Sequence, residues 1–212
     1  MYLPSHFTET RVPVLHEAIR RTAIGTLVTL GAEGLEASHV PMLIDPEPTP
    51  FGTLRGHIAR GNPQWKRYDG KMEALATFLG PNLYVTPSWY ETKRQTGKVV
   101  PTWNYVAVHA YGTPRFFDDR EPLLDIVTRL TVLHEGKRDK PWAVSDAPAD
   151  YIDGMLKAII GFDLPITRLE GKWKLGQNRS AADIAGVREG LAQESADDAA
   201  AMIDLMKKLE PK

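Results

Sequence analysis

The 212-residue sequence has 42% hydrophobic and 25% charged residues, a composition typical of globular proteins. It contains no cysteine, which excludes disulfides, thiolate-bound iron–sulfur clusters, zinc sites with Cys ligands and thiol catalysis, so any redox chemistry needs a bound cofactor. Lys and Arg number 26 against 27 Asp and Glu, a formal net charge of −1, without the basic excess usual in nucleic-acid-binding proteins. No signal peptide and no bilayer-spanning apolar run is visible, so we expect a soluble, cytoplasmic protein.

The first half of the chain is predicted to be rich in β-strands. A helix capped by Thr10 comes first, because the apolar residues after it recur at helical spacing. Apolar and β-branched runs bounded by Gly, Pro and Asn then predict strands over residues 23–30, 35–45, 53–60, 73–79, 83–86 and 99–117. Residues 31–34 are typical of a hairpin turn, and 62–67 is predicted to be a short helix capped by Asn62, with Pro63 in its first position.

The second half is predicted to be mainly helical, with two further strands. The expected helices cover residues 119–134, 148–158, 180–191 and 195–209, and the expected strands cover 160–169 and 172–175. Short strands separated by Gly and Pro, with helices at the periphery, predict an α+β fold with a barrel-like sheet. We expect one domain over residues 1–179 and a C-terminal helical extension over 180–212. The motifs of P-loop NTPases, Rossmann dehydrogenases, zincins and α/β-hydrolases are absent from the sequence.

Two segments of the β-rich half place polar groups at the ends of predicted strands. Ser38 and His39 interrupt an otherwise apolar strand, which suits either a solvated strand end or hydrogen bonds to a planar ligand. Further along, a strand ends at Arg60 and a helix is expected to begin at Asn62. Free N–H groups beside a guanidinium suit a phosphate, although an Arg in this position is more often simply solvated.

Two later segments combine aromatic side chains with polar or basic ones. Residues 81–105 hold two of the five Trp and three of the seven Tyr, interleaved with Ser, Thr, Lys and Asn. This pattern fits a core, a dimer interface or a flavin-sized pocket. Residues 171–179 form a basic, amide-rich strand end before a helix capped by Ser180. They fit either a surface turn or a second cationic arm for the same anion.

Together these segments resemble the PaiB family, described as FMN-binding negative transcriptional regulators. The matching stretches occur in family order and cover nearly the whole chain: Met1–Phe7, Ser38–Pro41, His57–Trp65, Ser88–Tyr90, Val100–Tyr105, His109–Gly112, Ile160–Phe162 and Lys172–Arg179. One departure is Gly176, where Ser is expected in many members. The resemblance implies an FMN-binding split β-barrel, similar in fold to pyridoxamine-phosphate oxidases and flavin reductases, in which two chains form a homodimer with FMN at the interface.

The resemblance also implies which residues form the cofactor site. The isoalloxazine or ribityl chain would be lined by Ser38, His39 and Val40. The phosphate would be held by His57, Ala59, Arg60 and the helix start at Asn62. The site would be completed, in part from the partner chain, by Trp103, Asn104, Lys174, Gln177 and Arg179. No catalytic residue and no metal ligand is assigned.

Three functions remain open for such a chain. It can be an FMN-binding regulator or flavin sensor, as in the family description, or a flavin-dependent oxidoreductase resembling flavin reductases or pyridoxamine-phosphate oxidases. The third function is haem binding, with His39, His57 or His109 as axial ligand. Between residues 180 and 206 the C-terminal helices hold six acids and one base, Arg188. Because acids repel phosphates, we expect this helical pair not to contact DNA, whatever the family description implies.

Overall fold

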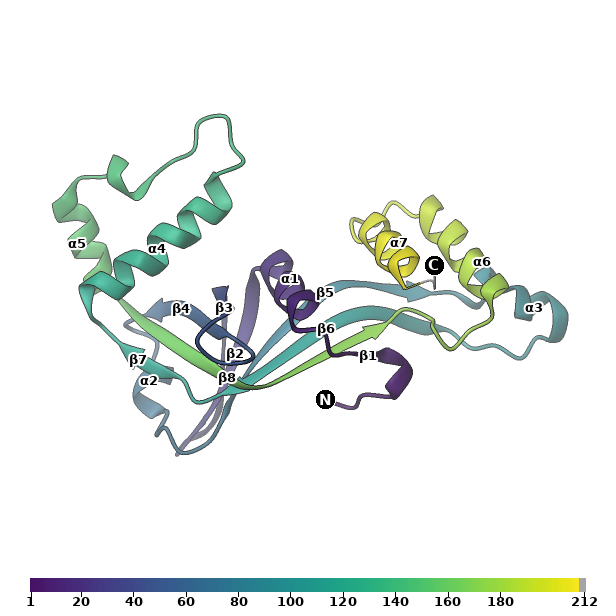
Figure 1. The fold of residues 1–212 in the computed structure, drawn as a ribbon, viewed down its shortest axis with the longest axis horizontal. Coiled ribbons are helices and arrows are strands. Elements are labelled where there is room, and N and C mark those ends of the chain that lie inside the picture. Colours follow the sequence, from purple (N-terminus) through teal and green to yellow (C-terminus); the bar gives the residue numbers. More distant parts are fainter. Residues whose placement is uncertain (210–212) are drawn as a thin grey trace. The chain divides into compact units, whose positions relative to one another are not determined.

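The computed structural model describes residues 1–209, which form eight β-strands and seven α-helices (Figure 1). The strands are β1 (Thr8–Glu9), β2 (Ile24–Gly31), β3 (Gly34–Asp45), β4 (Thr53–Ala59), β5 (Ala74–Val85), β6 (Thr102–Gly112), β7 (Arg115–Phe117) and β8 (Ile159–Lys174). The helices are α1 (Val12–Thr22), α2 (Gln64–Arg67), α3 (Glu91–Thr96), α4 (Arg120–Glu135), α5 (Ala149–Lys157), α6 (Ala181–Gln193) and α7 (Ala199–Lys208). The strand order is β1-β8-β4-β3-β2-β5-β6, β7 pairs with β8, and a further β6–β8 pairing closes the sheet. The predicted α+β fold with a barrel-like sheet is confirmed.

The described chain divides into two compact units. The central unit comprises Val12–Phe78 and His109–Leu169. The terminal unit comprises Met1–Arg11, Leu79–Val108 and the described residues from Glu170 onward. A domain boundary after residue 179 stays a prediction, and residues 210–212 of the expected C-terminal extension lie outside the described range.

The core of the central unit lies on one face of the sheet formed by β2, β3, β4 and β8. Side chains alternate along a strand, so every second residue of each strand points to this face. The largest of its side chains are at most 1% exposed: Leu27, Met42, Leu54, Phe162 and Leu164. The hairpin predicted at residues 31–34 is confirmed, since β2 and β3 pair in antiparallel register up to Gly31 and Gly34.

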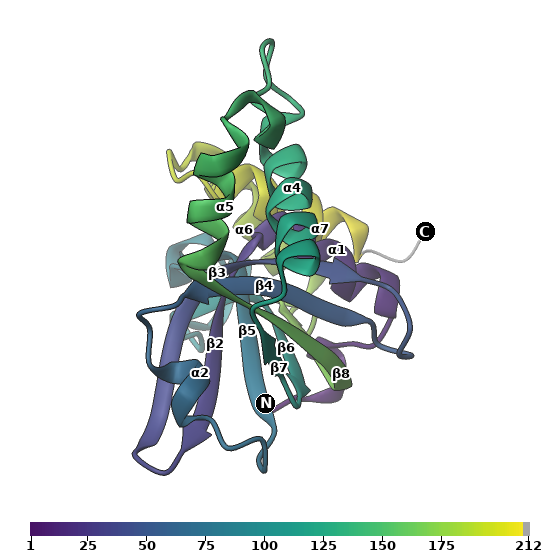
Figure 2. The same cartoon turned by 90° about the vertical axis from the view of Figure 1, so that its left-hand side faces the viewer.

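Helix α4 lies over the opposite face of β3 and β4 (Figure 2). Leu43 of β3 packs there against Ile126 and Leu130 of the helix. Arg129 of α4 also forms an ion pair with Asp45 at the end of β3. Because half-exposed ion pairs contribute little, the buried leucine and isoleucine side chains hold this helix in place.

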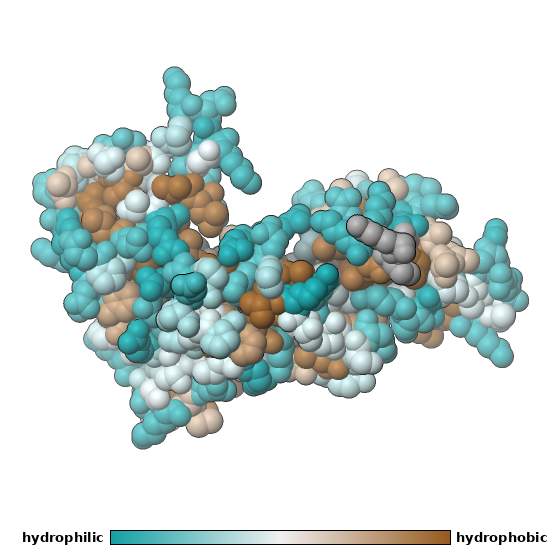
Figure 3. Space-filling model, in the orientation of Figure 1, coloured by the Kyte–Doolittle hydropathy of each residue, from teal (hydrophilic) through white to brown (hydrophobic). Residues whose placement is uncertain are grey.

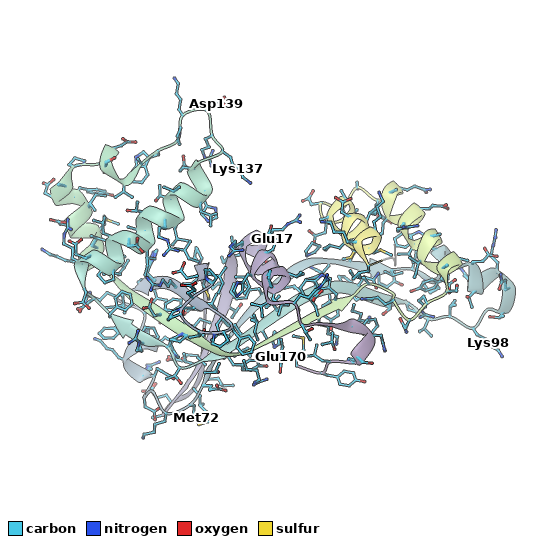
Figure 4. All side chains as sticks on the ribbon, in the orientation of Figure 1. Glu17, Met72, Lys98, Lys137, Asp139 and Glu170 are labelled. Atoms are coloured by element: carbon cyan, nitrogen blue, oxygen red, sulfur yellow. The ribbon has the colours of Figure 1, made fainter. Side chains whose placement is uncertain are left out.

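Exposed apolar side chains remain on the segment that contains α4 and α5 (Figure 3). They are Val132, Leu133, Trp142, Tyr151 and Met155, between 41% and 64% exposed. The loop that follows α4 carries Lys137 and Asp139 at its tip (Figure 4). Within residues 1–209, no helix is long and apolar enough to cross a membrane.

In the terminal unit, α6 packs against α7 and against the 3-10 turn Pro87–Trp89. Trp89 approaches α6 at two glycines spaced one helical turn apart. A Cβ atom at Gly186 would lie 2.1 Å from the Trp89 carbonyl oxygen, and one at Gly190 would lie 2.4 Å from the Trp89 ring. The close approach of Trp89 therefore depends on the absence of side chains at these two positions.

Two pairs of short strands predicted from the sequence are single strands in the structure. Strand β5 runs through Pro81 and Asn82 without a break, and the Asn82 N–H donates to Asp198 at 2.9 Å. Strand β8 runs through Gly171, because this residue pairs with Glu9 of β1. Breaks predicted from Gly and Pro alone were wrong at both places.

Other predicted boundaries shift by a few residues. The strand predicted over 99–117 is β6 and β7, which begin after Pro101 and Pro114, since proline lacks the N–H that a strand ladder needs. The last helix, predicted from residue 195, begins at Ala199. The helices predicted over 119–134, 148–158 and 180–191 agree with α4, α5 and α6 to within two residues.

Candidate functional site

The central unit brings Ser38 of β3 and Asn62 into direct contact. Asn62 Nδ2 donates to Ser38 Oγ at 2.7 Å, and Asn62 Oδ1 accepts from the Gln64 N–H at 3.0 Å. The Gln64 side chain is buried, and its Nε2 donates to Leu27 O and Thr29 Oγ1, each at 3.1 Å. The turn after β4 is therefore fixed against β2 and β3, with the Ser38 hydroxyl at its edge.

The helix after this turn is shorter than predicted. Helix α2 has only four residues, Gln64–Arg67, and it begins two residues after Asn62. One helical turn aligns few peptide dipoles, so its N-terminus attracts an anion weakly. A phosphate held here would be bound by side chains rather than by a helix dipole.

Arg60 directly follows Ala59, the exposed last residue of β4. Its Nε donates to Lys157 O at 2.6 Å and its Nη1 donates to Asp118 at 3.1 Å. The side chains of Arg60 and Asp118 are 38% and 63% exposed. Exposed ion pairs are worth at most about 1 kcal/mol, so an anion can replace Asp118 at little cost.

The predicted site residues on β3 and β4 point to two faces of the sheet. Ser38 and Val40 share the buried face, whereas His39 points to the other, where its Nδ1 lies 2.9 Å from Thr26 Oγ1. The register puts His57 on the same side as His39. Burial lowers the pKa of His57, whose Nδ1 has no hydrogen-bond partner, and so favours the neutral ring. A ligand on one face therefore reaches only some of these side chains.

The face that carries His39 continues across β2, β3 and β5 of the central unit as an uncovered surface. We call it the open sheet face; cross-strand pairing places on it Ile24, Thr26, Val28, Leu30, Leu35, Ala37, His39, Leu75 and Thr77. None of these residues is Asp, Glu, Lys or Arg. Ile24, Leu30 and Leu35 are 54%, 38% and 75% exposed. Contiguous exposed apolar surface of this kind marks an interaction site.

Sequence reasoning did not identify this surface. Residues 23–30 are apolar or β-branched at nearly every position, so they lack the alternation that separates a buried face from a solvated one. A strand with apolar side chains on both of its faces is expected to be covered on both faces. This pattern in residues 23–30 is the signal that could have revealed the open sheet face.

In the terminal unit, Lys174 at the end of β8 is the best-anchored of the predicted site residues. Its Nζ donates to Thr102 Oγ1 at 2.5 Å and to Trp103 O at 2.6 Å. Burial, together with the charges of Lys172 and Arg179, lowers the pKa of Lys174. The Trp103 side chain is 48% exposed, so an indole surface lies open beside this ammonium group.

The turn after β8 uses Gln177 to hold itself together. Gln177 Oε1 accepts from the Leu175 N–H at 2.9 Å, and Nε2 donates to Trp173 O at 2.6 Å. Gly176 has a φ of +90°, where L-residues are strained, so glycine suits this turn better than the Ser expected in the family. Gln177 therefore has little remaining capacity to contact a ligand.

Asn104 and Arg179 line a small pocket of the terminal unit together with Tyr90 and Asp183. Arg179 lies over the Tyr90 ring, 4.8 Å from its centroid, and Asn104 is 3% exposed. The pocket measures about 10 Å³, which is room for about one water molecule. A flavin does not fit in it, so this pocket by itself is not the flavin site, and the assignment of Asn104 and Arg179 to the cofactor stays a prediction.

Asp183 is a buried residue that sequence reasoning placed only among the surface acids of the C-terminal helices. Its carboxylate accepts from the Thr92 N–H at 2.9 Å and from Thr92 Oγ1 at 2.8 Å. Burial alone raises the pKa of Asp183, but the bonds from Thr92 and Ser180 and the charge of Arg179 outweigh it, and the pKa lies below the ordinary 3.8.

We expect Asp183→Asn to lower the free energy of unfolding by about 1–3 kcal/mol, because hydrogen bonds to a buried charge are lost. The folded-state pKa is depressed, so this contribution is complete above pH 3.8 and disappears as the pH falls through the folded-state value. Urea unfolding of both proteins between pH 3 and 7 measures it. A difference between them that does not shrink at the acidic end contradicts the assignment.

Among residues 1–209, no group of three or more His, Asp or Glu side chains could hold a metal ion. His39 contacts Thr26, and His109 lies near the Tyr111 ring, 6.3 Å between centroids. Haem ligation by any of the three histidines named above stays a hypothesis.

Comparison with known proteins identifies relatives along nearly the whole chain. The family model described as "Putative FMN-binding domain" matches residues 1–168. The chain is 31% identical over 207 residues to "Protease synthase and sporulation protein PAI 2" of Bacillus subtilis, covering 98% of this chain and 97% of that one. It is 40% identical to an uncharacterized protein of Aspergillus fumigatus, covering 90% of each.

Two solved structures share the fold. The conserved hypothetical protein Rv2991 of Mycobacterium tuberculosis has a TM-score of 0.57 at 11% identity, covering 82% of this chain and 91% of that one. The flavocytochrome Anf3 of Azotobacter vinelandii also has a TM-score of 0.57 at 11% identity, covering 87% and 78%. At this identity the likeness concerns the fold alone. The family match and the Bacillus relative confirm the resemblance inferred from the sequence, and the chain belongs to the PaiB-like family of FMN-binding-domain proteins.

Proposed function

We propose that this protein binds FMN between two copies of its chain and works as a flavin-dependent regulator or flavin sensor. Family membership supports the flavin. So do the names of two proteins of similar fold, the flavocytochrome Anf3 and the "FAD and Heme binding protein" of Mycobacterium smegmatis, with TM-scores of 0.57 and 0.53.

The open sheet face is the observation on which this proposal mainly rests. A flavin presents a flat, largely apolar ring system, which suits a face without Asp, Glu, Lys or Arg. Binding sites bury most of their ligand. The open sheet face of a single chain would cover only one side of a flavin and leave the other side exposed. A second copy of the chain supplies the missing wall and covers the apolar side chains as well.

The other polar groups named by the family pattern lie at β3 and β4. His39 borders the ring system on the open face, whereas Ser38 Oγ and Asn62 Nδ2 lie on the other side of β3 and are retained from the family pattern for the ribityl chain. Arg60 can exchange Asp118 for the phosphate, since its guanidinium is partly exposed. FMN bound there would supply one- and two-electron redox chemistry, and the chain's own residues would bind it and exclude water.

The family pattern also assigns residues of the terminal unit to the cofactor, in part from the partner chain. Lys174 and Trp103 offer an ammonium group and an exposed indole face. Asn104, Gln177 and Arg179 are retained from the family pattern, although their side chains already have partners or are buried. We assign them a supporting role in shaping this part of the site.

The regulatory role does not require DNA contact through α6 and α7. Glu189, Glu194, Asp197 and Asp204 are exposed on these helices and the loop between them. Such a surface repels the phosphate backbone. A flavin-dependent oxidoreductase is the alternative, because flavin chemistry needs no protein nucleophile. NAD(P)H oxidation by the FMN-loaded protein, measured beside a salt-controlled DNA-binding assay, separates the two.

Binding of FMN and riboflavin to purified protein tests the flavin site. We expect FMN to co-elute with the protein, and Arg60→Ala to weaken FMN binding roughly 10- to 100-fold while leaving riboflavin, which lacks the phosphate, almost unchanged. Arg120→Ala is the matched control, because Arg120 is an exposed arginine that pairs with Glu121 and Asp153 in the central unit.

Two outcomes count against this proposal. No retention of flavin at micromolar FMN refutes flavin binding by this chain. An equal loss of FMN and riboflavin affinity in Arg60→Ala shows that Arg60 acts through its bonds to Lys157 O and Ile159 O, and not on the phosphate.

A further inference from the structure

Lys172 of β8 is a buried lysine of the terminal unit without a carboxylate partner. Only 7% of the surface of Lys172 is exposed. Within residues 1–209, none of the ion pairs involves Lys172. Its Nζ lies 5.4 Å from the centroid of the Tyr2 ring and 5.4 Å from that of Tyr105. Two aromatic faces therefore take the place that an acid would normally occupy.

The nearest acid along the strand is already engaged. Glu170, two residues before Lys172 and labelled in Figure 4, accepts from the Met1 amino group at 2.6 Å. On β1, Glu9 is buried and bonded to Arg11. Neither carboxylate contacts Lys172.

A second cation stands beside the first. Lys174 lies two residues further along β8, on the same side of the strand. Its Nζ is 6.0 Å from the Tyr105 centroid, so the two ammonium groups share one aromatic ring. Burial first, and then the charges of Lys172 and Arg179, lower the pKa of Lys174, which is consistent with uncompensated positive charge at this place.

Such an arrangement is unfavourable unless an anion joins it. Burying a cation costs free energy that an aromatic face offsets only in part. Lys172 is buried, and its charge has no acidic counterpart within residues 1–209. The Tyr2 ring that borders it is 82% exposed, so an anion can approach the pair from this side.

We propose that Lys172 and Lys174 form an anion site that takes the carboxylate or phosphate group of a small molecule, bordered by the rings of Tyr2 and Tyr105. The site shares Lys174 with the flavin proposal, on which it rests to that extent, and goes beyond it through Lys172 and Tyr2, which the flavin proposal does not use. It gives the protein a place for an acidic ligand other than the FMN phosphate, which is assigned to Arg60.

Titration of ¹⁵N-lysine-labelled protein followed by NMR tests this site without any activity assay. Inorganic phosphate and sodium benzoate are the two probes, one for each chemical source of the anion. We expect at least one of them to give a saturable shift of the Lys174 Nζ signal and to raise the pKa of Lys174, because a bound anion favours the charged form.

Three variants make the test specific. Lys172→Met should weaken the probe roughly tenfold or more, since a charge-assisted bond is lost, whereas Lys172→Arg should keep most of the affinity. Lys98→Met is the matched control, an exposed lysine of the same unit (Figure 4). Without the probe, Lys172→Met should unfold at the same or a higher urea concentration than the parent, because an unpaired buried charge is removed.

The outcomes are distinguishable from those of the flavin proposal. Saturable binding in a protein that retains no FMN supports the anion site alone. A linear shift equal to that of Lys98 for both probes overturns it. Loss of probe binding on saturation with FMN also overturns it, because the two lysines would then serve the flavin phosphate. A less stable Lys172→Met whose probe affinity is unchanged assigns Lys172 a structural role instead.

Discussion

Gly186→Ala and Gly190→Ala are each expected to lower the free energy of unfolding by about 1–3 kcal/mol. A methyl group at Gly186 would meet the Trp89 carbonyl oxygen at 2.1 Å, and one at Gly190 would meet the Trp89 ring at 2.4 Å. A backbone carbonyl cannot turn aside as a side chain can, so Gly186→Ala should displace the whole Pro87–Trp89 turn. Urea unfolding, with Trp fluorescence as the signal, measures both variants.

Gly154→Ala is the control, because it is expected to raise the free energy of unfolding instead of lowering it. Gly154 lies inside α5, and a Cβ there would meet nothing within 4 Å. Alanine favours helix over glycine by about 0.8–1 kcal/mol, so this variant should be more stable than the parent. If all three variants are stabilised alike, Trp89 does not pack closely on Gly186 and Gly190 of α6.

These glycines show what a single sequence leaves hidden. Gly186 and Gly190 lie in a segment that was correctly predicted to be helical, where glycine reads only as a weak helix former. Glycine is required at these two positions because Trp89, about one hundred residues earlier in the chain, packs against them. The prediction of the helix needed only local spacing, whereas the reason for its glycines needed the contact.

The difference between local spacing and distant contacts also separates the predictions that were confirmed from those that were wrong. The β2–β3 hairpin and helix α4 follow from apolar spacing and turn residues close together in the chain. The breaks predicted in β5 and β8 were wrong: Gly171 of β8 pairs with the distant Glu9, and Asn82 of β5 bonds the distant Asp198. Strand continuity is therefore decided by partners that local sequence does not reveal.

The candidate site was predictable in its residue types and less so in its geometry. The family pattern named Ser38, Arg60 and Asn62, and the structure joins Ser38 to Asn62. It could not reveal that Asp118 holds Arg60, or that Lys172 lacks an acid, because both depend on pairings between distant segments. The open sheet face required the strand register before its residues could be seen to share one surface.

Ala37→Arg is expected to abolish the proposed dimer and, with it, FMN retention. Ala37 is exposed on the open sheet face, opposite Val28 in the β2–β3 register, so the folded monomer can accommodate an arginine there. In a dimer that covers this face, the new charge would be buried without a partner, at a cost of about 3 kcal/mol or more, which is roughly 100-fold in the dissociation constant. Sedimentation velocity across protein concentration measures the association, and FMN co-elution measures the cofactor.

Val132→Arg tests whether the dimer uses another surface. Val132 is 64% exposed on α4 and belongs to the exposed apolar residues of the α4–α5 segment. Val132→Arg therefore adds the same positive charge as Ala37→Arg, but on a different apolar surface. If Ala37→Arg dissociates the dimer and Val132→Arg does not, the open sheet face is the interface. If the effects are reversed, the chains associate through α4 and the flavin site lacks its proposed second wall. A dimer that withstands both while FMN is lost only from Ala37→Arg would mean that a single copy binds the flavin, because the substitution would then act on the cofactor directly.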